Sequence, residues 1–257
     1  MNPKKIKKII TKFIKEKVSG ANADGIVIGI SGGIDSAVVA KLCADALGRD
    51  KVLGLIMPSP ATPVFDVSDA AEFSEELGID YEIINIMRIL DSFLDEIKEN
   101  GMESKTATGN LMARTRMCLL YYHANSLNRL VAGTGNKSEI LCGYFTKFGD
   151  GGCDLLPIGD LYKTQVRELA KYLEIPGAIT EKVPSAGFWH GQSDEEELGI
   201  SYKILDKILI KLIDKRQEIP GIFRELKIEK ELAQRVEKLV KESAHKRHTP
   251  GICRIEI

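Results

Sequence analysis

The chain has 257 residues, 44% of them hydrophobic, and a formal net charge of −1, so it can bury a substantial core and gives no sign of a nucleic-acid or anionic-membrane partner. No apolar run approaches the ~18 residues of a membrane span. The five cysteines contain no CxxC pair, which argues against a structural zinc site or a disulfide framework and favours reduced thiols in a cytoplasmic protein.

Residues 1–18 predict an amphipathic helix. Apolar residues recur at helical spacing, and lysines interrupt every apolar run, which is unlike a signal peptide. Such a helix can lie on a membrane surface, but we favour packing against the core or against a second subunit.

The segment Gly25–Ser36, GIVIGISGGIDS, predicts a buried strand that runs through a glycine turn into a helix. Free backbone amides and the helix dipole at such a point favour an anion such as phosphate. Ser31 and Ser36 add hydroxyl donors. Asp35 would repel phosphate unless a cation such as Mg²⁺ lay between them.

A Gly-Gly pair alone is explained by a tight turn between strand and helix, and the absence of lysine excludes a Walker A loop. The full pattern Ser-Gly-Gly-x-Asp-Ser after a buried strand resembles the pyrophosphate-binding loop of the N-type ATP pyrophosphatases. That resemblance implies cleavage of ATP to AMP and pyrophosphate while an acceptor is adenylated. It leaves the acceptor open.

Further strands and helices alternate along the first half of the chain. Strands are predicted at 51–57, 80–86 and 129–133, and helices at 34–47, 66–77, 87–98 and 110–125. Asp66 is expected to cap the helix that it begins, and residues 99–109 to form a mobile linker. The pattern predicts an α/β fold, a doubly wound parallel sheet with helices on both faces, whose ligands bind at the carboxyl ends of the strands.

The helix at 110–125 is apolar nearly all round, so we expect it to be buried, for example in a subunit interface. Its Arg114 and Arg116 would then need anionic partners, which either a structural carboxylate or a substrate can supply. The turn at 134–139, TGNKSE, follows the last strand. If the two strands are neighbours, Glu139 comes to lie beside Asp35, and the two carboxylates can share one Mg²⁺.

Three later segments carry polar residues in unusual settings. The glycine-rich stretch 144–158 holds Lys147, Asp150 and Asp154 and is read as a substrate-shaping loop. Lys163 begins the helix 161–173, where a cation opposes the helix dipole unless it faces an anion, and phosphate is the anion we expect. The irregular stretch 182–199 is read as a lid that excludes water, with a capping box formed by Ser193 and Glu196. Two C-terminal helices, at 202–217 and 230–244, read as ordinary packing.

Taken together, these motifs resemble the NAD synthetases in order and spacing over essentially the whole chain. The matching segments are SGGIDS, ARTRM at 113–117, GTGNKSE at 133–139, FTKFGDGGCDLLPI at 145–158, LYKTQVRELA at 161–170, VPSAGFWHGQSDEEELG at 183–199 and HKRHTP at 245–250. No residues are left for the amidase domain of glutamine-dependent members. The resemblance therefore implies a single, ammonia-dependent NAD synthetase domain over residues 1–257, with an adenine nucleotide alpha hydrolase-like sheet and C-terminal helices.

The resemblance implies a ligase reaction in two steps. The carboxylate of deamido-NAD attacks the α-phosphorus of ATP to give an acyl-adenylate and pyrophosphate, and ammonia then displaces AMP to give NAD. A carboxylate that attacks a polyanion needs neutralising charge, which fits Mg²⁺ and lysine. The family also implies a homodimer with deamido-NAD at the interface.

Residue roles carried over by position are as follows. ATP contacts fall on Gly29, Ile30, Ser31, Gly32, Gly33, Ile34, Asp35, Ser36, Thr134, Lys163 and Ser185, and the Mg²⁺ ligands on Asp35 and Glu139. Deamido-NAD contacts fall on Arg114, Lys147, Asp154, His245 and Lys246. Many family members have threonine where Ser185 stands, and the hydroxyl is retained. Asp35 and Lys163 are catalytic candidates, and Asp150 is our own candidate for handling ammonium.

Two other classes of function compete with this reading. Another ATP pyrophosphatase, such as a GMP synthetase subunit or a tRNA-thiolating enzyme, would share SGGIDS, but the absence of CxxC and of a basic face counts against thiolation. A nucleotide sensor without turnover would keep the fold, but the presence of Asp35, Glu139 and Lys163 counts against it.

Overall fold

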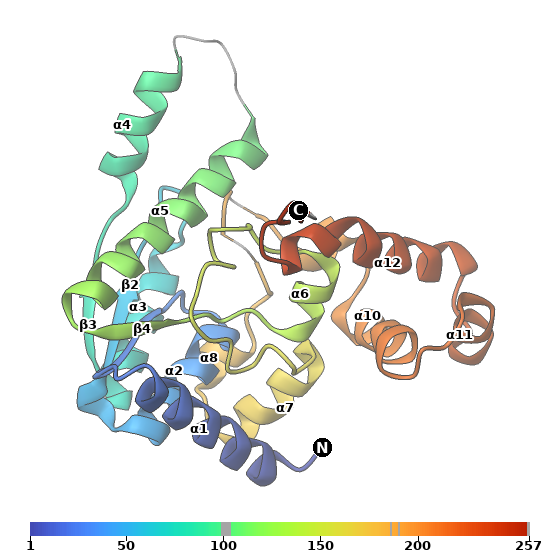
Figure 1. Ribbon diagram of the computed structural model, residues 1–257, viewed down its shortest axis with the longest axis horizontal. Helices are drawn as coiled ribbons and strands as arrows, with labels where there is room; N and C mark the ends of the chain where they lie inside the picture. The colour runs from blue at the N-terminus through green and yellow to red at the C-terminus, as the bar shows by residue number, and fades with distance from the viewer. Residues whose placement is uncertain (99–103, 186, 190, 256–257) are drawn as a thin grey trace.

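The centre of the fold is a parallel four-stranded sheet in the order β3-β2-β1-β4 (Figure 1). Its strands are β1 (Gly25–Gly29), β2 (Val52–Ile56), β3 (Asp80–Ile83) and β4 (Arg129–Ala132). In the central strand, Ile26 lies opposite Val52 on one side and Leu130 on the other. This computed structural model describes residues 1–98, 104–185, 187–189 and 191–255, and its sheet confirms the predicted fold class.

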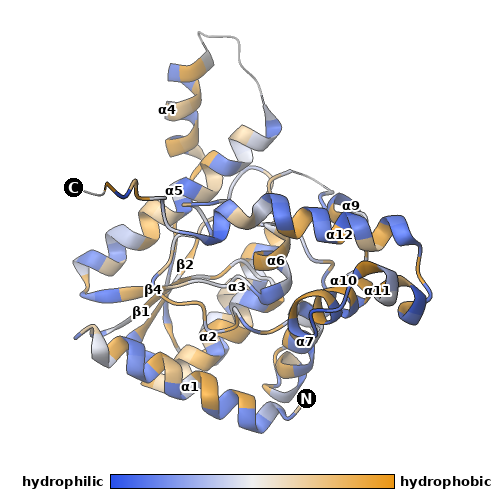
Figure 2. Ribbon diagram, turned by 45° about the vertical axis from the view of Figure 1, so that its right-hand side comes forward, coloured by the Kyte–Doolittle hydropathy of each residue, from blue (hydrophilic) through white to orange (hydrophobic). Residues whose placement is uncertain are grey.

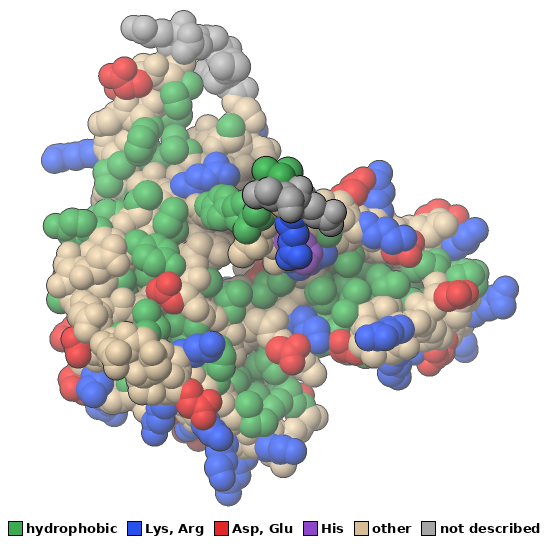
Figure 3. Space-filling view, viewed as in Figure 1, with side chains coloured by type: hydrophobic (Ala, Val, Ile, Leu, Met, Phe, Trp, Pro, Cys, Tyr) green, Lys and Arg blue, Asp and Glu red, His purple; other side chains and the backbone are tan. Residues whose placement is uncertain are grey.

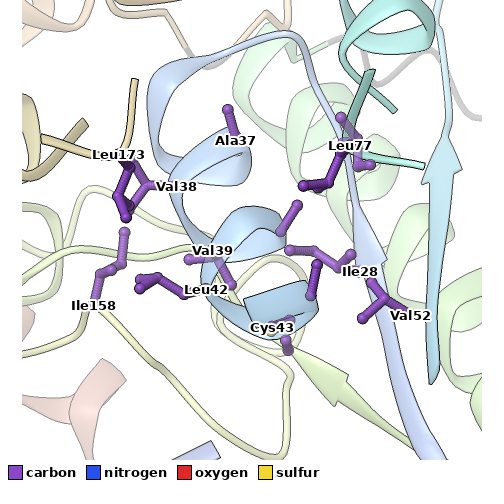
Figure 4. Packing of buried hydrophobic residues seen from close by; sticks show 14 of the residues in the cluster. Ile28, Ala37, Val38, Val39, Leu42, Cys43, Val52, Leu77, Ile158 and Leu173 are labelled. Carbon is purple, nitrogen blue, oxygen red and sulfur yellow. The ribbon is translucent and has the colours of Figure 1, made fainter. Parts of the chain in front are cut away.

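Helices cover both faces of the sheet. One face carries α2 (Ile34–Leu47) and α3 (Val64–Leu77), with α1 (Pro3–Gly20) and α7 (Lys163–Tyr172) packed outside α2. The other carries α4 (Met87–Lys98) and α5 (Lys105–Ser126). Figure 4 shows Val39 and Leu42 of α2 between Ile28 of the sheet and Ile158 on the other side of the helix. Since α2 is packed on both sides, it is apolar nearly all round. The positive φ of Gly48, 98°, ends α2 where the sequence predicts.

A second hydrophobic core lies beside the sheet and is built by the C-terminal helices. Its elements are α6 (Lys137–Cys142), α10 (Tyr202–Leu209), the π-helical turn Ile210–Asp214, α11 (Ile219–Leu226) and α12 (Lys230–Glu242). Shorter elements are η1 (Arg49–Lys51), α8 (Gly177–Thr180), α9 (Asp194–Leu198) and η3 (Ser243–Arg247). The second core meets the sheet layers at α6 and α7, so any residue at that boundary is held by both cores.

Several predicted boundaries are wrong, each for a local reason. Pro63, rather than Asp66, occupies the N-cap position of α3, and Asp66 lies in the first turn of that helix. The helix predicted from residue 110 begins at Lys105 because Ser104 caps it, and residues 99–103 of the predicted linker lie outside the described residues. The chain between the two predicted C-terminal helices is itself helical, because Ile219–Leu226 forms α11, with Pro220 in a first turn that tolerates proline. Ser193 makes no side-chain cap bond, so the capping box predicted there is absent.

Within this single chain α5 is only partly buried, so the prediction that a subunit interface covers it stays a prediction. Arg114 and Cys118 are exposed, and Tyr122 keeps 69% of its surface exposed. The neighbouring α4 exposes Phe93 and Ile97 as well. Figure 2 shows several hydrophobic, orange residues along α4, and in Figure 3 hydrophobic side chains gather along the arm that α4 and α5 form. Among the described residues, no helix has the length and hydropathy needed to cross a bilayer.

Candidate active site

The predicted phosphate loop lies at the carboxyl end of β1 and is shaped by its two serines. Ser36 Oγ donates to the carbonyl of Gly33 at 2.9 Å and accepts from the backbone N–H of Ser31 at 3.2 Å. Gly32 adopts a φ of +74°, a conformation that favours glycine. Because the Ser36 side chain closes the turn, the loop is preformed.

A buried cluster of one lysine and two carboxylates adjoins this loop. Lys163 Nζ donates to Asp35 Oδ2 and, at 3.2 Å, to Glu139 Oε1. The lysine side chain is 3% exposed and the carboxylates 16% and 15%. Since β1 and β4 are neighbours, the turn after β4 lies beside the loop after β1, as the sequence predicts. The anion that faces Lys163 is therefore a carboxylate pair rather than phosphate alone.

Asn136 orients both carboxylates of the cluster, a role that we did not predict. Its Nδ2 donates to Asp35 Oδ1 at 3.1 Å, and its Oδ1 accepts from the N–H of Glu139 at 3.1 Å. Glu139 Oε2 in turn accepts from the N–H of Asn136 at 3.1 Å. This is a capping box that starts α6, and the spacing Asn-x-x-Glu in the sequence was a signal that could have identified it.

The second core fixes the backbone at Lys163. Ser138 Oγ donates to Asp206 Oδ1 at 2.5 Å and accepts from the N–H of Lys163 at 3.0 Å. Asp206 Oδ2 accepts from the N–H of Thr164 at 2.8 Å, which satisfies a free amide in the first turn of α7. Asp206 belongs to α10, so reading this helix as ordinary packing missed a carboxylate that supports the site.

A third carboxylate, Asp194 at the start of α9, lies next to the cluster and was also missed. Asp194 is 4% exposed, and its Oδ2 accepts from Tyr202 Oη at 3.1 Å. Its Oδ1 is buried and has no hydrogen-bond partner among the described residues. The Tyr202 ring lies 5.2 Å from Lys163 Nζ, which adds a cation–π contact. The irregular stretch 182–199 thus ends inside the site, although its residues 186 and 190 lie outside the described part of the chain.

Burial and charge perturb the pKa values in the cluster in opposite directions. Burial raises the pKa of Glu139 to about 7, and the charge of Lys163 opposes that rise. Burial alone would lower the pKa of Lys163, but Asp35 and Glu139 raise it above its ordinary range. Burial also raises the pKa of Asp194. A cluster with three carboxylates and one lysine retains negative charge and therefore attracts a further cation.

The donor atoms of the cluster fit Mg²⁺ only in part. Among the described residues, no group of three or more His, Cys, Asp and Glu side chains is arranged as a metal site. Two carboxylates are nevertheless the usual protein contribution to Mg²⁺, with water and substrate phosphates supplying the other ligands. The unpartnered Oδ1 of Asp194 offers one more buried oxygen. The residues present thus offer two carboxylates, Asp35 and Glu139, as protein ligands, and the metal assignment stays a prediction.

Apart from the cluster, a cavity of about 310 Å³ lies between the start of α5, the loop at 144–158 and the stretch 182–199. Four aromatic and seven polar or charged side chains line it: Thr106, Asn110, Tyr144, Phe145, Thr146, Asp150, Phe188, Trp189, Gln192, Glu197 and Lys246. Tyr144 Oη donates to Glu197 Oε2 at 2.6 Å, and Gln192 Nε2 donates to Glu197 Oε1 at 3.1 Å. A pocket that combines aromatic side chains with polar groups able to fix an orientation is suited to a small organic ligand.

The NAD synthase family model matches residues 6–250. The chain belongs to the NAD synthase family. A relative from Thermococcus kodakarensis, an NH(3)-dependent NAD(+) synthetase, is 53% identical over 241 residues, 94% of this chain and 93% of the relative. Among solved structures, an NH3-dependent NAD synthetase from Campylobacter jejuni superposes with a TM-score of 0.84 and shares 35% sequence identity. The match covers 99% of this chain and 100% of the Campylobacter chain. An NMN synthetase from Francisella tularensis is 36% identical with a TM-score of 0.88, at the same coverage.

Of the five residues predicted to bind deamido-NAD in this NAD synthase, Lys246 lines the cavity of about 310 Å³, and three others are joined to one another by hydrogen bonds. Lys147 Nζ donates to the carbonyl of His245 at 2.7 Å, and Arg114 donates to the carbonyl of Lys147 at 3.3 Å. Lys246 Nζ lies in the cavity wall and donates to the carbonyls of Gly143 and Phe145, at 2.7 and 2.9 Å. The C-terminal motif and the loop at 144–158 are therefore brought together, as their shared assignment predicts.

Three other predicted residues are placed apart from these groups. Asp154 Oδ2 accepts from the N–H of Val131 at 2.7 Å, so it also serves the structure of the sheet edge. Thr134 lies in the turn after β4, near the phosphate loop. Ser185 is exposed, and its hydroxyl accepts from the N–H of Gly187 at 3.1 Å. The family match confirms the predicted family and fold, while the roles of individual residues stay predictions.

Proposed function

We propose that this chain is an ammonia-dependent NAD⁺ synthetase, which converts deamido-NAD to NAD with ATP and ammonia and releases AMP and pyrophosphate. The observation that carries the proposal is the cluster of Lys163, Asp35 and Glu139 beside the preformed loop after β1. The family match and the names of its relatives support the same activity. We further propose that residues 1–257 act as one such domain.

In this proposal the phosphates of ATP bind the loop at 29–36 and the hydroxyl of Thr134. The free amides at the start of α2 and the ammonium of Lys163 neutralise the developing charge on pyrophosphate. Mg²⁺ held by Asp35 and Glu139 would supply further neutralisation at the phosphates. Asn136 keeps both carboxylates in place, because its side chain bonds to Asp35 and to the backbone of Glu139.

The cavity of about 310 Å³ is the site that we propose for the nicotinate end of deamido-NAD. Its aromatic walls suit a planar ring, and Arg114, Lys147 and Lys246 bring positive charge toward a ligand that carries a carboxylate and phosphates. His245 and Asp154 complete the proposed contacts. Asp150 also lines this cavity, with Oδ1 accepting from the N–H of Thr146 at 2.8 Å. A carboxylate there is suited to bind ammonium and accept its proton near the acyl carbon.

We also propose that the enzyme is a homodimer in the cytoplasm. The exposed apolar side chains on α4 and α5, among them Phe93, Ile97 and Tyr122, form the surface that a second copy would cover (Figure 3). The five cysteines are all free, which suits a reducing compartment. Size measurement in solution tests the dimer directly.

The decisive experiment supplies the purified protein with ATP, Mg²⁺, deamido-NAD and ammonium. Equal amounts of NAD, AMP and pyrophosphate are expected. ADP as product, or no turnover at saturating ammonium, would refute the proposal. Two parallel reactions sharpen it: glutamine in place of ammonium tests the nitrogen donor, and nicotinate mononucleotide in place of deamido-NAD tests the acceptor, because one structural neighbour is an NMN synthetase.

A further inference from the structure

Lys182 forms an ion-pair network outside the cluster, where the stretch 182–199 begins. Its Nζ lies 2.7 Å from Asp66 Oδ1 and 2.6 Å from Asp69 Oδ2. It also lies 5.4 Å from the centre of the Phe65 ring. The three charged side chains are only 20%, 23% and 21% exposed, so water screens this network less than an ordinary surface pair.

All three partners of Lys182 belong to the start of α3, and that turn packs against the phosphate loop. A Cβ atom placed on Gly32 would lie 2.5 Å from the carbonyl oxygen of Asp66. The backbone of the loop and the backbone of α3 are therefore in direct contact. Lys182 is thus attached to the element that supports the phosphate loop from behind.

Two anchors immediately precede Ser185, the ATP contact proposed for this stretch. Three residues before it, Lys182 is fixed to α3. One residue before it, the carbonyl of Pro184 accepts from the N–H of Asp194 at 3.0 Å, which joins the beginning of the stretch to α9. The Ser185 side chain is exposed and hydrogen-bonds within its own turn, to the N–H of Gly187. Its position relative to the phosphate loop therefore depends on the two anchors.

We propose that Lys182 is a positioning residue, which holds the stretch 182–199 against α3 so that Ser185 meets the phosphates and water is kept from the acyl-adenylate. The inference rests on the proposed function. Without the ammonium, Asp66 and Asp69 repel each other and the stretch loses its attachment to α3. Water can then add to the acyl carbon while the bond to the oxygen of AMP breaks, which returns deamido-NAD and AMP and wastes one ATP.

The test is Lys182→Met, which keeps an apolar chain beside Phe65 and removes the charge. Two quantities are measured: NAD formed per pyrophosphate released, and the affinity for ATP with Mg²⁺ from the fluorescence of Trp189, the single tryptophan. We expect the ratio to fall from one to below about one half and ATP binding to weaken about five- to tenfold, as for loss of a partly buried ion pair. The double variant Asp66→Asn with Asp69→Asn should behave in the same way, and adding Lys182→Met to it should change nothing more.

Lys211→Met is the matched control. Lys211 Nζ pairs with Glu225 Oε1 at 2.5 Å, and its side chain is 10% exposed, but it belongs to the C-terminal helices. The control should keep a ratio of one. A wild-type ratio and ATP affinity in Lys182→Met would overturn the inference, as would an equal loss in Lys211→Met. If Lys182→Met does not fold, the Asp66/Asp69 double variant decides. Failure of the wild type to make NAD would refute the proposed function instead, while the ATP titrations would still test the anchor.

Discussion

Replacing Gly32 by alanine should both destabilise the protein and damage the phosphate loop. The backbone of Gly32 has a φ of +74°, which costs an L-residue about 1–2 kcal/mol. The added Cβ would lie 2.5 Å from the carbonyl oxygen of Asp66, and 3.2 and 3.3 Å from its carbonyl carbon and Cα. These are backbone atoms of a packed helix, so they cannot rotate away as a flexible side chain would.

The two effects combine to about 2–5 kcal/mol, if forced overpacking costs about 1–3 kcal/mol beyond the strained backbone. For a chain of this size that corresponds to a fall in melting temperature of about 5–15 °C. Because the loop must move away from α3 to accommodate the methyl group, pyrophosphate release should also fall. Thermal unfolding followed by circular dichroism, with and without ATP and Mg²⁺, measures the first effect, and a pyrophosphate assay measures the second.

Gly20→Ala is the control for this experiment. Gly20 ends α1, and no atom lies within 4 Å of an added Cβ there. Alanine should therefore be neutral or slightly stabilising at that position. The reasoning fails if Gly32→Ala melts within about a degree of the wild type and releases pyrophosphate at the normal rate.

Three further predictions concern the cluster and its support. Asp35→Ala and Glu139→Ala should each stop pyrophosphate release, and continued release at the normal rate would remove them from the proposed metal site. The pKa of Glu139, raised by burial to about 7, lies above its unfolded value, so this residue stabilises the fold at low pH and that contribution is lost as pH rises through 7. Affinity for Mn²⁺, which needs the carboxylate, should rise with pH over the same window, and the rise should be absent in Glu139→Gln. Asp206→Asn should cost about 1–3 kcal/mol in urea unfolding, because the N–H of Thr164 and the hydroxyl of Ser138 lose a charged acceptor.

Much of the sheet could be predicted because its signals are local. The run GIVIGI followed by SGGIDS specifies a strand, a turn and the start of a helix within twelve residues. Each of the strands β1 to β4 lies inside the segment predicted for it. The closeness of Asp35 and Glu139 also followed, since parallel strands that are neighbours end at one edge.

The rest of the site could not be predicted because it depends on how distant segments dock. Asp194, Tyr202 and Asp206 reach the cluster only when the second core packs beside α6 and α7, and nothing in their own helices marks them as functional. The exposed face of α5 is a separate matter. An apolar helix predicts a covered surface, but the pattern does not say whether the same chain supplies the cover.

The placement of the cluster between two hydrophobic cores has a consequence for the order in which the enzyme becomes competent. Asp35 and Glu139 come with strands and turns of the sheet, whereas Asp206 and Tyr202 come with helices whose apolar contacts are largely their own. The sheet layers can therefore assemble before the C-terminal helices are in place. A nascent chain at that stage would hold a complete phosphate loop yet lack the groups that fix the backbone of Lys163. The support of Lys163 is thereby completed only when the C-terminal helices have docked on α6 and α7.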